Sequence, residues 1–118
     1  MDVVVTVPKG MWMEWIEEGD LPGDDPEYRS HFWIPRTGLP DIRFGERVYI
    51  VAHGKLRGYA PIVAMEHYCE LRPGRACLVR EGGAVAVTIP DPIRGFQSWR
   101  YRWWEREAEL PFPDWMIP

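Results

Sequence analysis

The chain has 118 residues, of which 46% are apolar and 27% are charged, and its formal net charge at pH 7 is −4. This length is typical of one domain spanning residues 1–118, and the composition argues against an intrinsically disordered chain. No apolar run approaches the roughly 20 residues that a membrane-spanning helix needs, so the sequence gives a membrane role no support.

The negative charge comes from one acidic segment. Between Met11 and Glu27 there are seven acidic residues and no basic ones. Removing their −7 from the total of −4 leaves +3 for the rest, so the remainder of the chain can present a basic face. Of the 14 basic residues all but Lys9 and Lys55 are arginine, which binds phosphate through two parallel N–H groups and stacks on aromatic rings.

A strand and a short helix are predicted first along the chain. The β-branched run "DVVVTVP" (Asp2 to Pro8) predicts a buried strand. In "GMWMEWIEEG", apolar side chains recur at the spacing of one helix face, and Gly19 supplies a stop. The apolar face of this predicted amphipathic helix consists of Trp12, Trp15 and Ile16.

The middle of the chain predicts strands in hairpin succession. "YRSHFWIP" predicts a strand, and "ERVYIVA" (Glu46 to Ala52), apolar on both faces, predicts a central one. "HGK" predicts a tight turn with Gly54 at positive φ, followed by the long strand "LRGYAPIVAMEHYCEL". Pro61 implies an edge position or a bulge, because proline cannot donate to the ladder. After the turn "RPGR", the segments "ACLVR" and "AVAVTIP" predict a hairpin around Glu81 to Gly83.

An unusual aromatic segment, "GFQSWRYRWWERE" (Gly95 to Glu107), follows. Its rings favour a strand through Trp104, whereas its "EREAEL" end favours a helix, and we predict the strand. About six strands with one clear helix predict a mostly β fold in the form of a small antiparallel barrel or a strongly curved sheet.

The cysteines and histidines predict neither a disulfide nor a metal site. Cys69 and Cys77 do not make a disulfide framework, and nothing at the start resembles a targeting signal, so we expect free thiols and a cytoplasmic location. The spacing of "HYC" fits neither structural nor catalytic zinc, and no nucleophile-elbow pattern surrounds Ser30 or Ser98. No metal and no cofactor is therefore expected.

The order of these features resembles the PUA-like superfamily, in particular EVE and ASCH domains. The similarity covers about Val3 to Tyr68: an opening strand, the helix "MWMEWIEEG", an aromatic segment ending near Arg36 in "HFWIPR", and "FGERVYIVAHGKLRGYAPI", which is similar to the family's Gly-acid strand and its hairpin return. The resemblance implies an α+β pseudobarrel of about six strands with one or two short helices. It also implies nucleic-acid binding and, in EVE-type members, a modified base held in an aromatic-walled pocket.

The candidate ligand-binding residues combine rings, which stack on bases, with arginines, which neutralise phosphates. One group lies in the aromatic segment: Trp99, Arg100, Tyr101, Arg102 and Trp104. The other lies in or near the elements that resemble the family pocket: Trp12, Trp33, Arg36, Arg57 and Tyr59. The structural alternative is that the rings fill the barrel and the arginines pair with acids.

Three functions remain open on this sequence. The first is a domain that binds nucleic acid or a nucleotide-like ligand without catalysis, such as a modified-base reader. The second is an ASCH-like hydrolase (an amidohydrolase or ribonuclease), although the "GxKxxTxR"-like motif of those relatives is missing. Such an enzyme would need a Lys with a nearby Thr and Glu that converge in the pocket, for example Lys55 and Glu66. The third is a protein-interaction module that uses exposed aromatic residues as hot spots.

Overall fold

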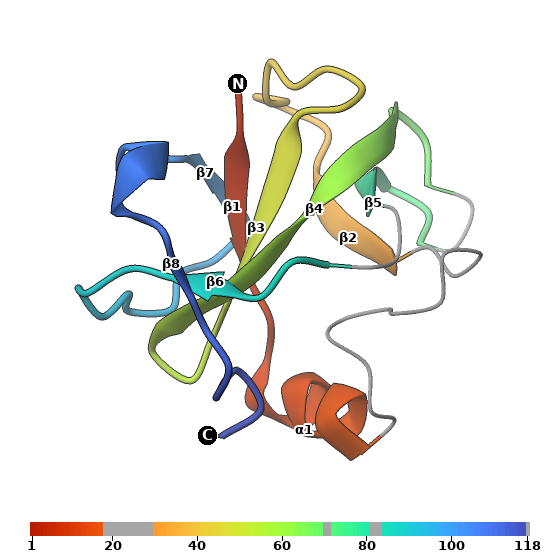
Figure 1. Ribbon diagram of the computed structural model, residues 1–118. Helices are drawn as coiled ribbons and strands as arrows, with labels where there is room; N and C mark the ends of the chain where they lie inside the picture. The colour runs from red at the N-terminus through yellow and green to blue at the C-terminus, as the bar shows by residue number, and fades with distance from the viewer. Residues whose placement is uncertain (18–29, 70–71, 81–83, 118) are drawn as a thin grey trace.

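The structure is a computed structural model that describes residues 1–17, 30–69, 72–80 and 84–117. Six strands form one mixed sheet in the order β2-β5-β4-β3-β1-β7, which curls into a half-barrel, and β6 and β8 form a small second sheet (Figure 1). The elements are β1 (Val3–Thr6), α1 (Lys9–Glu17), β2 (Ser30–Pro35), β3 (Arg47–Ala52), β4 (Lys55–Glu66), β5 (Arg75–Arg80), β6 (Val87–Thr88), β7 (Trp99–Tyr101), the 3-10 turn η1 (Arg106–Ala108) and β8 (Leu110–Pro111). The mostly β fold expected from the sequence is confirmed.

The middle strands β1 and β3 are buried on both faces, as their unbroken apolar runs predict. They run parallel to each other, and β1 separates β3 from the edge strand β7. Alternate side chains enter two cores, so Val3 and Val5 pack on one side and Val4 on the other. We call them the concave core, which includes Trp12, Ile34 and Leu78, and the convex core, which includes Tyr49, Ile89 and Trp104.

The C-terminal third covers the convex face of the sheet. The β6 and β8 ribbon crosses in front of β4, as Figure 1 shows, and backbone hydrogen bonds in both directions join Tyr59 of β4 to Val85. Gly58 makes this crossing possible, because a Cβ at that position would lie 2.6 Å from the carbonyl oxygen of Val85. The convex core is therefore closed by a segment far away in the sequence.

Several sequence predictions for the central hairpin are confirmed. β3 lies inside the sheet, Gly54 has a φ of 75°, and His53 beside it is also left-handed, which is the geometry of a tight hairpin turn. β4 also lies inside the sheet, so Pro61 does not mark an edge. Instead the register with β5 shifts between Ile62 and Ala64, next to the proline.

Two predictions about the C-terminal half are wrong. The segment "AVAVTIP" does not form a hairpin with β5, because β5 already lies between β2 and β4 and has no free edge; β6 pairs with β8 instead. The aromatic strand ends at Tyr101, not at Trp104. Its partner runs out there, because Tyr101 lies opposite Val3, the first residue of β1.

The expectation of free thiols is also wrong, because Cys69 and Cys77 form a disulfide. The turn between them reverses the chain and brings their Cα atoms to 5.5 Å, a separation that ordinary disulfides share. Counting cysteines could not reveal this proximity. The cytoplasmic location, which rested partly on free thiols, stays a prediction.

The acidic stretch predicted as a solvated surface lies mostly outside the described residues, as does the side chain of Trp15. Glu14 and Glu17, the part that is described, are exposed on α1. Among the described residues, no helix has the length and apolar character required to span a membrane.

Candidate functional site: a groove at the seam of the half-barrel

The most developed concave surface lies where the two edges of the curled sheet approach each other. Two cavities of about 300 and 380 Å³ adjoin there and share Trp33, Arg72 and Ser98 in their walls. Residues of β1 and the 97–98 loop before β7 come from one edge, and residues of β2 from the other. We call the combined cavity the seam groove. Its other lining residues are Val5, Thr6, Val7, Pro8, Met11, Phe32, Ile34, Pro35, Arg75 and Gln97.

The seam groove has an apolar floor and a polar mouth. Val5, Val7 and Ile34 are buried members of the concave core and form the floor. Arg75, Gln97 and other polar side chains surround the mouth, and the described lining residues include two arginines and no carboxylate. Such a site accepts a flat apolar group at depth and an anionic group at the surface.

Trp33 and Arg72 are the central pair of the groove. The guanidinium of Arg72 lies 4.9 Å from the centre of the Trp33 ring, in the geometry of a cation–π contact. The ring is still 42% exposed. β2 pairs only with β5, so the alternation of its side chains leaves Trp33 facing outward while Phe32 and Ile34 pack inward.

The opposite wall is shaped by Ser98, whose φ of 64° is in the left-handed region that non-glycine residues rarely adopt. This turn connects the loop to β7 and leaves Gln97 and Ser98 exposed along the groove. Their amide and hydroxyl groups donate and accept hydrogen bonds, which is the chemistry that distinguishes the edges of bases.

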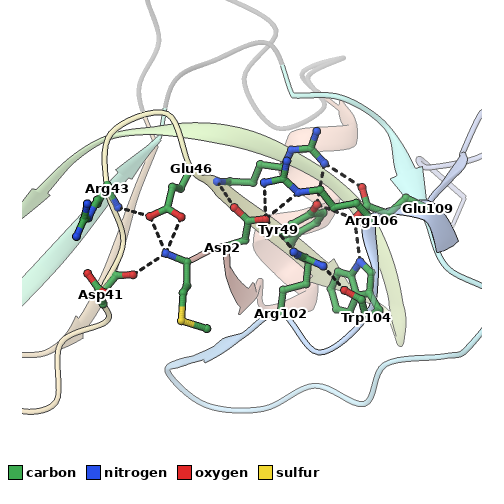
Figure 2. Close-up of polar contacts among 11 residues, drawn as sticks. Asp2, Asp41, Arg43, Glu46, Tyr49, Arg102, Trp104, Arg106 and Glu109 are labelled. Carbon is green, nitrogen blue, oxygen red and sulfur yellow. Dashed lines mark hydrogen bonds and ion pairs between the residues drawn. The ribbon is translucent and has the colours of Figure 1, made fainter.

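A second cluster of arginines and rings has a different character (Figure 2). The buried carboxylate of Asp2 accepts hydrogen bonds from Arg102 Nε at 3.1 Å, from Arg106 Nη2 at 2.8 Å and from the backbone N–H of Arg47 at 2.9 Å. Burial by itself raises the pKa of Asp2, but the hydrogen bonds from Arg47 and Arg106 outweigh burial, so the net pKa lies below its ordinary value. Asp2 therefore stays ionised and holds both guanidinium groups.

Glu109 organises the neighbouring part of the same cluster. It accepts hydrogen bonds from the Tyr49 hydroxyl at 2.6 Å and from Trp104 Nε1 at 2.9 Å, and it forms an ion pair with Arg47 at 3.2 Å (Figure 2). Burial, followed by the hydrogen bond to Glu109, raises the pKa of Tyr49 above its ordinary value. Tyr49 thus remains a hydrogen-bond donor. We call the Asp2 and Glu109 contacts together the acid–arginine cluster.

The residues predicted in the aromatic segment are divided between packing and ion pairs. Trp104 is only 9% exposed and packs edge-to-face against Tyr49, with ring centroids 5.1 Å apart. Arg102 is held by Asp2 and by the carbonyl oxygen of Trp104. Trp99 and Tyr101 pack against the concave core, and Arg100 covers the ring of Phe96 at 4.5 Å.

The residues predicted near the family-like pocket are also dispersed. Trp12 is fully buried in the concave core, and Tyr59 packs beside Tyr49. Arg36 is exposed and lies 4.3 Å from the Tyr68 ring. Of the predicted pocket residues, Trp33 lines the seam groove, whereas Trp12, Arg36, Arg57 and Tyr59 do not.

Arg57 is fully buried and serves the C-terminal segment. It is the extra residue where the register of β3 and β4 shifts, and its Nε donates to the carbonyl oxygen of Ala52 at 2.9 Å. Its Nη1 donates to the carbonyl oxygens of Trp115 at 2.8 Å and Ile117 at 2.6 Å. Burial lowers the pKa of this guanidinium. Arg57 thus anchors residues 115–117 to the barrel.

Sequence reasoning missed Arg72, Arg75, Gln97 and Ser98. Arg72 and Arg75 flank the Pro73–Gly74 turn, and this turn was the available signal, because arginines at a tight turn are held outward near a strand end. Their proximity to Trp33 depends on the β2 and β5 register, which places Trp33 opposite Cys77. No periodicity in the sequence specifies that register.

The structure separates the pair that a hydrolase would need. Lys55 is the first and Glu66 the last residue of the 12-residue strand β4, far beyond hydrogen-bond reach at a rise of about 3.3 Å per residue. Within the described parts of the chain, no group of three or more His, Cys, Asp or Glu side chains is placed to hold a metal ion.

The fold and the groove define a mostly β half-barrel with an aromatic and arginine-lined cavity at its seam. Comparisons with protein-family models, with curated proteins and with solved structures found no match to this chain.

Proposed function

We propose that the chain binds single-stranded nucleic acid or a nucleotide-like ligand in the seam groove. In this proposal a base enters the cavity beside Trp33, and Arg72 and Arg75 contact the phosphate. No catalytic step is part of the proposal. The observation that carries it is the meeting of an exposed tryptophan with two arginines over an apolar cavity, where none of the described lining residues is a carboxylate.

The chemistry of the groove supports this ligand class. A base has an apolar face that stacks on an indole ring, and such stacking contributes about 1–3 kcal/mol per base. The guanidinium groups of Arg72 and Arg75 have no carboxylate partner among the described residues, so they are available to a phosphate. Gln97 and Ser98 are exposed beside them and can hydrogen-bond a base edge or a sugar hydroxyl.

We also propose that the half-barrel is a PUA-like domain of the EVE or ASCH type, with a modified base as one candidate ligand. The opening strand β1, the helix α1 that follows it, and the central hairpin of β3 and β4 support this kinship. The groove lies between the end of β1, α1 and β2, which all fall within the range Val3 to Tyr68 that the sequence resemblance covers.

The test is a titration of single-stranded, duplex and modified-base oligonucleotides, followed by tryptophan fluorescence at two salt concentrations. Trp33→Ala should weaken binding of the preferred oligonucleotide by about 5- to 150-fold, the equivalent of about 1–3 kcal/mol of stacking. Arg72→Ala with Arg75→Ala should lower the slope of log affinity against log salt by about 0.7 for each phosphate contact removed.

Arg43→Ala is the matched control. Arg43 is exposed and lies in the connection before β3, outside the lining of the seam groove. It removes one positive charge, as each of the two groove substitutions does, and should leave the affinity within about twofold, since one distant surface charge is screened by salt. Absence of salt-sensitive binding to every oligonucleotide would contradict the proposal. Equal losses in the Arg43 and Arg72 variants would show non-specific attraction instead.

A further inference from the structure

The disulfide lies directly beside the seam groove. Cys77 is paired with Trp33 across the β2 and β5 register, and residues opposite each other in an antiparallel pair share a face of the sheet. Cys69 and Cys77 are both buried, with Val79, against Val63 and Ala64. The disulfide thus lies on the same face of the sheet as Trp33, in the neighbouring strand.

The bond also closes the segment that carries the groove arginines. The two cysteines are separated by 8 positions, and Arg72 and Arg75 both lie between them. Backbone hydrogen bonds tie the same segment: Cys69 N–H donates to Arg75 O at 2.9 Å, and Arg75 N–H donates to Arg72 O at 3.2 Å. Because Arg72 and Arg75 are exposed, such bonds compete with water and hold the segment only weakly on their own.

The two ends of this segment are held unequally. Cys77 belongs to β5, which is hydrogen-bonded to β2 on one side and to β4 on the other. Cys69 follows the end of β4 at Glu66 and belongs to no strand. A disulfide restricts the conformations open to the chain between its ends. Without the bond, the Cys69 end is the one that gains freedom.

We propose that the Cys69–Cys77 disulfide regulates ligand binding in the seam groove. With the bond intact, the turn at Arg72 is held beside Arg75, the first residue of β5, so that both arginines meet a phosphate; with the bond reduced, the turn at Arg72 is released and binding weakens. This inference rests on the proposed function. The physical basis is preorganisation, since ordering Arg72 at the moment of binding would then cost conformational entropy.

The chemical step requires a dithiol reductant. One thiolate of the reductant attacks the sulfur of Cys69, the half of the bond that retains some exposure, and forms a mixed disulfide while Cys77 leaves as a thiolate and takes up a proton. The second thiolate of the reductant displaces Cys69, which is protonated in turn. The reductant becomes a disulfide, and the two cysteines gain two electrons and two protons.

The experiment compares the oxidised and the reduced full chain with one labelled single-stranded oligonucleotide, the one that binds best in the titration above. Thiol titration establishes that the oxidised form has no free thiol and the reduced form has two, and circular dichroism establishes that both are folded. We expect the reduced form to bind about tenfold more weakly. Hydrogen exchange should rise at the Cys69 and Arg72 amides and stay unchanged in β1 and β3.

Two variants make the result specific. Arg72→Ala with Arg75→Ala should bind weakly in both redox states, because the groups that the disulfide positions are gone. Cys69→Ser with Cys77→Ser should bind like the reduced protein whether or not reductant is present. If this variant does not fold, the comparison of reduced and oxidised wild type decides alone.

The outcomes separate this inference from the proposed function. Equal affinity in the two redox states overturns the redox inference and leaves the proposed function standing. Absence of binding in both states overturns the proposed function, and the inference with it. Global unfolding on reduction also overturns the inference, because the bond would then maintain the fold and not the groove.

Discussion

The seam groove and the acid–arginine cluster contain the same residue types, aromatic rings beside arginines, in different surroundings. In the groove, Trp33 is 42% exposed, and the lining residues that the structure describes include Arg72 and Arg75 but no carboxylate. In the cluster, Trp104 is 9% exposed and its indole N–H is bonded to Glu109. In the cluster, the carboxylates of Asp2 and Glu109 occupy the arginines and the indole N–H, so these groups serve packing within the molecule.

The comparison explains why the aromatic segment was the obvious candidate and yet contributes mainly packing and ion pairs: Trp104 is buried, and Trp99 and Tyr101 pack half-buried against the concave core. Its arginines find their counter-charge far away in the sequence, since Asp2 bonds Arg102 and Arg106 across the whole chain. Glu109, an acid that follows the segment closely in the sequence, forms its ion pair with Arg47 instead. Nearest in sequence and nearest in space were different residues.

The largest contrast should come from truncating one tryptophan in each region. Trp104→Ala removes a buried ring of the convex core and the donor to Glu109, so it should lower the free energy of unfolding by about 3–5 kcal/mol. Trp33→Ala should change it by less than about 1 kcal/mol, because the ring is largely at the surface. Urea unfolding of both variants measures the difference. Equal decreases in the free energy of unfolding for the two variants would contradict the distinction between the two regions.

Asp2→Asn should have a smaller effect, and one that depends on pH. It removes the charge that Arg102 and Arg106 share, so it should lower the free energy of unfolding by about 2 kcal/mol at pH 7. The value is reduced because Arg106 is about half exposed and its ion pair is screened by solvent. The folded-state pKa of Asp2 lies below its ordinary value of 3.8, so its contribution is present above that value and is lost as the pH falls through the folded-state pKa.

The measurement is urea unfolding of wild type and Asp2→Asn from pH 7 downward. The difference in unfolding free energy should stay constant above about pH 5 and narrow below the ordinary carboxyl pKa. Asp91→Asn is the matched control, since Asp91 is exposed and has no ion pair among the described residues. A difference that grows as the pH falls would contradict the assignment.

The fold was predictable where the determinants are local. The alternating and continuous apolar runs of β1, β2 and β3 indicate their burial directly, and Gly54 marks its turn. The pairing of β6 with β8 was not predictable, because it depends on β5 being occupied on both edges. Both errors in the C-terminal half concern which strand is free to pair, a property of the assembled sheet.

The site was predictable only through Trp33. Its outward direction follows from the alternation of β2, whereas the arginines beside it arrive through the β2 and β5 register and the turn closed by Cys69 and Cys77. Contacts between strands and a disulfide across a turn depend on the tertiary structure, so the sequence pattern alone does not predict them. Buried rings such as Trp12 and Trp104 also cannot be separated from exposed ones by residue type alone.

A further predicted change concerns Gly58, where the acid–arginine side of the molecule depends on a close crossing of two segments of the chain. An alanine Cβ would lie 2.6 Å from the carbonyl oxygen of Val85, and that oxygen accepts the Tyr59 N–H at 3.0 Å. Because backbone must shift to relieve the contact, Gly58→Ala should lower the free energy of unfolding by about 1–3 kcal/mol.

Gly10→Ala is the control for Gly58→Ala, since a Cβ at position 10 meets nothing within 4 Å and alanine favours the helix that contains it. It should leave stability unchanged or raised by up to about 1 kcal/mol. If the crossing holds the C-terminal layer over the convex core, Gly58→Ala should also raise hydrogen exchange in the Val85 and Val87 amides while β2 and β5 stay protected. A loss of hydrogen-exchange protection spread evenly over both regions would contradict a local role for the crossing. The groove and the cluster would then unfold together as one cooperative unit.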